Sequence, residues 1–85
     1  MEVKVGYFLV YLVYYNLGNT YAEMKNFSKA LHYYSRTLDF NSNDPDIYIN
    51  LSDVYFQLNQ QNEAKDILVK AKEIRLRANQ PILIK

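Results

Sequence analysis

Apolar side chains recur at steps of three and four residues from Leu9 to Met24, which is the spacing of one face of an α-helix. The same spacing appears in three later stretches, and residues that favour turns separate them. The pattern predicts an all-α fold with helices at about residues 9–24, 27–40, 45–58 and 62–78. The side chains expected to face inward are Leu9, Leu12, Val13, Leu17, Tyr21 and Met24 in the first helix, Phe27, Ala30, Leu31, Tyr34 and Leu38 in the second, Tyr48, Leu51, Tyr55 and Leu58 in the third, and Ala64, Ile67, Leu68, Ala71, Ile74 and Ala78 in the fourth.

Local residue types set the expected helix boundaries. Asn26 can cap the second helix by accepting a hydrogen bond from an early backbone N–H group. The turn-forming stretch NSNDP, residues 41–45, places Asp44 as the cap of the third helix and Pro45 at its first position. Pro81 ends helical structure in the tail NQPILIK, whose apolar side chains Ile82, Leu83 and Ile84 have no obvious cover within the chain.

One aromatic and asparagine pattern occurs twice, as YYNLGNTY at residues 14–21 and as YINLSDVY at residues 48–55, 34 positions later. Two matched pairs of helices with a fixed period and short turns indicate stacked helical hairpins, not a symmetric four-helix bundle. Small residues within the pattern let the two helix backbones of a pair approach each other. The matching positions are Tyr14, Leu17, Gly18, Tyr21, Ala30 and Tyr34 in the first copy, and Tyr48, Leu51, Ser52, Tyr55, Ala64 and Leu68 in the second.

These residues and their period resemble the tetratricopeptide repeat family, whose 34-residue unit reads W-x2-L-G-x2-Y, then A-x3-F, then P. The resemblance implies two stacked hairpins at residues 11–44 and 45–78, with an apolar extension of the first helix at residues 1–10 and a tail at residues 79–85. The closing Pro is missing at Ser42 and Leu76, so the final helix is expected to overrun its repeat and to be elongated.

In this family the first helix of each hairpin lines a concave groove, so the resemblance implies a non-catalytic module for protein–protein interaction. The groove would bind an extended peptide or a partner helix. Asn16 and Asn50 are of particular interest, because a carboxamide carries both an acceptor and donors and can bind a peptide backbone. The positions implied to line the groove are Leu12, Tyr15, Asn16, Asn19 and Glu23 in the first copy, and Asp46, Ile49, Asn50, Asp53 and Gln57 in the second.

Two other functions within the same fold stay open. The chain could be an architectural subunit of a larger complex, in which a neighbouring protein fills the groove permanently. It could also resemble the carboxylate clamp of chaperone adaptors, which uses Asn at the positions of Asn19 and Asn50. That clamp also needs Lys where this chain has Tyr15, and two cations where it has Gln80 and Ile84, so the clamp is largely disabled.

Composition limits the alternatives further. A chain of 85 residues and 10.1 kDa has room for one small domain. The absence of Cys removes disulfides and thiolate metal sites, and we expect an intracellular, cytoplasmic protein. The apolar run VGYFLVYLVYY at residues 5–15 is too short to span a membrane, and no membrane association is expected. A net charge of +1 does not favour nucleic-acid binding, although the last 21 residues hold six basic and two acidic side chains.

Candidates for catalysis or metal binding are scarce. His32 is the only histidine and is expected on the outward side of the second helix. The carboxylates Asp44, Asp46 and Glu63 lie at helix starts, where they complement the helix dipole. Two glycines cannot form a glycine-rich phosphate loop. The sequence therefore predicts neither an enzyme nor a bound cofactor or metal.

Apolar residues are placed at both ends of the expected stack, at residues 5–13 and 82–84. Terminal repeats that face solvent have polar outer faces, and about three repeats are normally needed for stability. We therefore expect self-association or membership of a larger complex, and an isolated chain that is not a stable monomer.

Overall fold

Four α-helices make up the computed structural model, which describes residues 2–79 and their side chains from residue 6 onward. They are α1 (Glu2–Glu23), α2 (Phe27–Leu38), α3 (Pro45–Gln57) and α4 (Gln61–Asn79). The predicted all-α fold is confirmed, and each predicted helix is present. The first helix begins earlier than its periodicity indicates, and the last helix overruns its repeat as expected.

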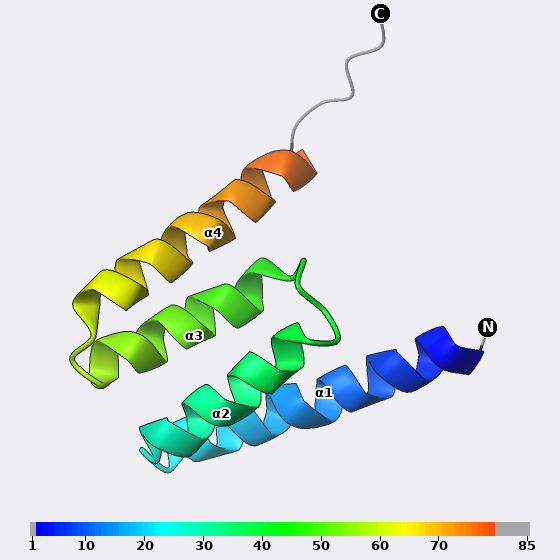
Figure 1. Ribbon diagram of the computed structural model, residues 1–85, viewed down its shortest axis with the longest axis horizontal. Coiled ribbons are helices and arrows are strands. Elements are labelled where there is room, and N and C mark those ends of the chain that lie inside the picture. Colours follow the sequence, from blue (N-terminus) through cyan, green and yellow to red (C-terminus); the bar gives the residue numbers. More distant parts are fainter. Residues whose placement is uncertain (1, 80–85) are drawn as a thin grey trace, which may run out of the picture.

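The helices form two antiparallel hairpins, α1 with α2 and α3 with α4 (Figure 1). The hairpins stack through the contact between α2 and α3, so α3 lies between α2 and α4. The start of α1 and the end of α4 both project from the same end of the stack. This arrangement confirms two paired hairpins in place of a symmetric bundle.

The turns inside the two hairpins have the same backbone form. Lys25 and Asn59 have positive φ angles of 61° and 64° and lie 34 positions apart. In each turn the next backbone N–H bonds a carbonyl of the preceding helix at 2.8 Å, from Asn26 to Tyr21 and from Gln60 to Tyr55. This is a common way for a helix to end in a left-handed residue, and it returns the chain antiparallel to itself.

Both predicted caps are confirmed. The side chain of Asn26 accepts a hydrogen bond from the backbone N–H of Lys29 at 3.3 Å, which fixes the start of α2. Asp44 accepts a bond from the backbone N–H of Asp46 at 2.9 Å, with Pro45 at the first position of α3. Asp44 also accepts a bond from the hydroxyl of Tyr11 at 2.8 Å, so this cap ties α3 to α1.

The core lies where α2 and α3 meet. Ala30 and Tyr34 of α2 are buried with Leu51 and Val54 of α3. A second cluster joins α3 to α4 through Tyr48, Ala71 and Ile74.

The expected inward face of the first helix is wrong in part. Leu9, Val13 and Met24 are 55%, 57% and 65% exposed, whereas Tyr11 and Gly18 are buried. Val13 and Met24 lie on a side of α1 that is exposed, whereas α2 packs along another side and the side chains of α3 reach Tyr15 and Asn19. In α4, Leu68 and Ala78 are likewise exposed. The tail residues Ile82, Leu83 and Ile84 lie outside the described residues.

Candidate functional site

A cleft of about 340 Å³ opens between the first hairpin and α3. Four of the ten side chains expected to line a groove meet in it: Asn19 and Glu23 from α1, and Asn50 and Asp53 from α3. The cleft exists because α3 stacks on the α1–α2 hairpin, which places two repeat positions of α1 beside two of α3. The remaining lining residues are Ala22, Tyr34 and Val54.

A hydrogen-bond network connects the two asparagines. The Nδ2 atom of Asn50 donates to the hydroxyl of Tyr15 at 2.9 Å and to the Oδ1 atom of Asn19 at 3.4 Å. The hydroxyl of Tyr34 also donates to Oδ1 of Asn19. The Nδ2 atom of Asn19 and the Oδ1 atom of Asn50 make no hydrogen bond of standard geometry with the described residues, although the carboxamide of Asn19 lies near enough to the hydroxyl of Tyr15 to lower its pKa. Neither atom is buried without a partner, so one donor and one acceptor reach the solvent of the cleft.

The electrostatic field in the cleft is negative. The carboxylates of Glu23 and Asp53 are exposed, and no lysine or arginine is among the described residues that line the cleft. Burial first, and then the nearby Tyr15, Asp53 and Glu23, together raise the pKa of Tyr34 to about 12. Burial also raises the pKa of Tyr15, with help from Asp46 and Asp44. Both hydroxyls therefore remain hydrogen-bond donors at neutral pH.

The other expected groove residues do not share this cleft. Asn16 and Gln57 are exposed, and Leu12 is half-buried on α1. Asp46 lies 3.8 Å from Arg75 of α4, in an exposed ion pair. Ile49 lines a separate groove between α3 and α4. Asn16 and Asn50 hold equivalent repeat positions, yet Asn50 has a neighbouring helix and Asn16 does not.

Tyr34 lines the cleft, although the sequence assigned it only to the core. It lies on α2, whereas the expected groove positions all came from the first helix of each hairpin. Its hydroxyl nevertheless orients Asn19 from beneath the cleft. The repeat pattern needs only an aromatic ring at this position, and a tyrosine there adds a hydroxyl. Because a buried hydroxyl requires a polar partner, its presence indicated a polar neighbour for Tyr34.

The carboxylate clamp is not supported by the described part of the cleft. Its two asparagines are present and close together, but the position that requires a cation holds Tyr15. The carboxylates of Glu23 and Asp53 would repel a terminal carboxylate. The two remaining clamp positions, Gln80 and Ile84, lie outside the described residues.

His32 is exposed, as expected, and its ring contacts Tyr33 edge-on with centroids 4.9 Å apart. Within residues 2–79, no group of three or more His, Cys, Asp or Glu side chains could hold a metal ion. None of the four described helices is long and apolar enough to cross a membrane.

Comparison with protein families assigns both hairpins. Residues 11–44 match one tetratricopeptide repeat model, and residues 45–77 match a second model of the same repeat. No curated protein and no solved structure gave a match. The matched residues coincide with the four-helix stack, and repeats of this type generally serve protein–protein interaction. The chain therefore belongs to the tetratricopeptide repeat family.

Proposed function

We propose that this chain is a non-catalytic interaction module whose cleft binds an extended, basic segment of a partner protein. The observation that carries the proposal is the pairing of Asn19 and Asn50, which offer one free donor and one free acceptor between two carboxylates. No described residue of the cleft carries a compensating positive charge.

Backbone recognition follows from the two asparagines. The Nδ2 atom of Asn19 can donate to a peptide carbonyl, while the Oδ1 atom of Asn50 accepts from a peptide N–H. An extended segment suits this pair better than a helix, because a helix has already paired its own backbone groups. Each hydrogen bond is worth about 1 kcal/mol and is independent of the bound side chain.

Side-chain preference follows from Glu23 and Asp53. A lysine or arginine of the bound segment lies in the field of both carboxylates, whereas an acidic side chain is repelled. Both carboxylates are exposed, so added salt should weaken the attraction. The carboxylates of Glu23 and Asp53 therefore select the charge of the bound segment, and the hydrogen bonds of the two asparagines orient its backbone.

The proposal is tested with three fluorescent peptides of equal length, with lysine and arginine, glutamate and aspartate, or serine and alanine at their central positions. Fluorescence anisotropy should show the tightest binding for the basic peptide, weaker binding for the neutral peptide and the weakest binding for the acidic peptide. Glu23→Gln combined with Asp53→Asn should weaken that binding about fivefold.

A matched control removes two carboxylates elsewhere. Asp39→Asn combined with Glu63→Gln makes the same change in net charge, at exposed positions that do not line the cleft. It should leave the affinity for the basic peptide nearly unchanged. Equal binding of all three peptides, or equal losses in the two double variants, would contradict the proposal.

A further inference from the structure

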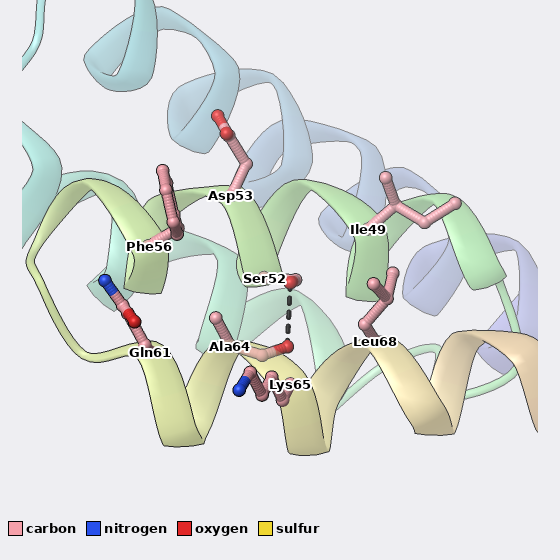
Figure 2. Close-up of a pocket in the computed structure, with 8 residues that line it drawn as sticks. All are labelled: Ile49, Ser52, Asp53, Phe56, Gln61, Ala64, Lys65 and Leu68. Atoms are coloured by element: carbon pink, nitrogen blue, oxygen red, sulfur yellow. Dashed lines mark hydrogen bonds between the residues drawn. The ribbon is translucent and has the colours of Figure 1, made fainter.

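A second groove, of about 390 Å³, runs along the outer side of the second hairpin (Figure 2). Four of its side chains come from α3 and four from α4. The hydroxyl of Ser52 donates to the carbonyl of Ala64 at 2.8 Å, which closes the base of the groove. Ile49 and Leu68 lie near one end of the groove, where Leu68 points from α4 toward α3, and Phe56 lies at the other end. Its lining is mostly apolar, and no described helix covers it.

The first hairpin has the same groove, and there it is filled. The positions 34 residues earlier are Tyr15, Gly18, Asn19 and Ala22 on α1, and Phe27, Ala30, Leu31 and Tyr34 on α2. Ala30 and Tyr34 form the main core cluster with Leu51 and Val54 of α3, and four of the other positions pack against that cluster. The groove of the first hairpin is thus the surface against which α3 packs, and we call a groove of this kind a seat.

The face of α3 that fills this seat has an uncovered counterpart on α1. Leu51 and Val54 are buried in the seat, and Leu58 is half-buried beside them. Ile47, one helical turn earlier on α3, is also buried. The equivalent positions on α1 are Val13, Leu17, Thr20 and Met24. Of these, Val13 and Met24 are more than half exposed, and Thr20 is also exposed. The groove between α3 and α4, at one end of the stack, therefore has no described helix packed in it. At the other end, α1 presents an exposed face of the type that packs in such a groove.

We propose that α1 of a second copy of this chain docks in the groove between α3 and α4, so that copies associate head to tail. The contact continues the α2–α3 interface already present within each chain. It joins two different surfaces, so it adds copies in one direction and does not close into a twofold dimer.

One of the hydrogen bonds that join α3 to α1 within the chain has a counterpart in this contact. Asn50 donates to Asn19 within the chain. The equivalent pair is Asn16 of the docking copy and Asp53 of the receiving copy. A carboxylate accepts such a bond more strongly than a carboxamide does. Asn16, which has no described helix beside it in a single copy, then acquires one of the two hydrogen bonds of Asn50, because Ile49 replaces Tyr15 in the second hairpin and cannot accept the other.

The volumes of the two seats are also related. Ala22 and Tyr34 of the first seat correspond to Phe56 and Leu68 of the second. The smaller side chain at Leu68 is compensated by the larger side chain at Phe56, so the two grooves have similar side-chain volume. The start of α1 and the end of α4 overrun their repeats at the same end of the stack. Docking would therefore lay the two overhanging segments side by side, where exposed Leu9 and Leu76 can be covered.

The new contact should be weaker than its intramolecular counterpart. Leu31 and Phe27 of the first seat are replaced by Lys65 and Gln61, which reduces the apolar area available for burial. Association also costs the rotational and translational freedom of a second molecule. Copies should therefore dissociate on dilution.

Sedimentation velocity of the full 85-residue chain, without any peptide, tests the proposal from micromolar to near-millimolar concentrations. The chain should shift from the mass of one copy, 10.1 kDa, toward dimers and longer species as concentration rises. Val13→Glu disables the docking face, and Leu68→Glu disables the seat. Both residues are exposed, so each variant should keep its helicity by circular dichroism and sediment as a single copy.

Mixing the two variants distinguishes head-to-tail docking from other modes of association. Each variant keeps the surface that the other lacks, so an equal mixture should form dimers and nothing larger. Val69→Glu makes the same substitution at an exposed α4 residue outside the groove and should associate like the unmodified chain. A chain that stays single at every concentration, or variants that fail to complement each other, would overturn the proposal. Neither variant alters the peptide cleft, so this result is independent of the peptide measurements.

Discussion

The ring of Tyr34 lies so close to Gly18 that a Cβ atom added to the glycine would come within 2.5 Å of the Tyr34 Cδ1 atom. Gly18→Ala should therefore destabilise the protein, because the aromatic ring is buried and has no room to move away. We expect a loss of about 1–3 kcal/mol in the free energy of unfolding from overpacking. Urea denaturation followed by circular dichroism measures it.

Gly6→Ala is the matched control, because Gly6 lies in the same helix with nothing within 4 Å of an added Cβ. Alanine has the higher helix propensity, so this variant should gain up to about 1 kcal/mol. Opposite signs for the two substitutions are expected. A Gly18→Ala variant as stable as Gly6→Ala would show that the ring of Tyr34 does not restrict this position.

The second prediction concerns Asp44, which caps α3 and accepts a hydrogen bond from the hydroxyl of Tyr11. Asp44→Ala removes both interactions, and we expect a loss of about 1–3 kcal/mol in thermal or urea unfolding. Asp39→Ala removes an exposed carboxylate whose partner is Arg36, on the surface of α2. It should cost less than about 0.5 kcal/mol. Similar losses in the two variants would show that the tie between α1 and α3 adds little.

The hairpins and their caps could be predicted because they depend on residues that are close in sequence. Asn26 and Asp44 act on backbone groups within three residues, and the apolar period defines a helix without knowledge of its neighbours. The inward face of α1 could not be predicted in the same way. Its apolar residues occupy more than one face, and periodicity does not tell which face receives a neighbouring helix.

For the candidate site, the sequence predicted which repeat positions hold asparagines but not which side chains they contact. The repeat placed Asn16 and Asn50 at equivalent positions, but Asn50 bonds Tyr15 and Asn19 because α3 has a hairpin to pack against. On the equivalent side of α1 no helix of residues 2–79 is packed, and Asn16 is exposed. Which repeat positions meet across an interface depends on the stacking of hairpins, and that information is not local.

The third prediction concerns alkaline pH. Burial is the main cause that raises the pKa values of Tyr11 and Tyr34 from 10.0 to about 12 in the folded state, followed by the hydrogen bond to Asp44 for Tyr11 and by the nearby Tyr15, Asp53 and Glu23 for Tyr34. The neutral phenols therefore favour folding fully below about pH 10, and this contribution is lost as the pH rises toward about 12. The free energy of unfolding should fall over this window. Tyr34→Phe removes one of the two groups, so its stability should fall less steeply than that of the unmodified chain; parallel curves would contradict the assignment.

The last prediction concerns the hydrogen bond between Asn50 and Tyr15, which are joined at 2.9 Å across the α1–α3 contact. Asn50→Ala should cost about 1 kcal/mol in stability, and Tyr15→Phe somewhat less, because the ring of Tyr15 still packs against the core. The double variant should lose less than the sum of the two single losses, since both changes remove the same bond. Asn16→Ala is the matched control and should leave stability of the dilute chain unchanged, because Asn16 is exposed. Strictly additive losses at positions 15 and 50 would show that this bond does not hold the two hairpins together.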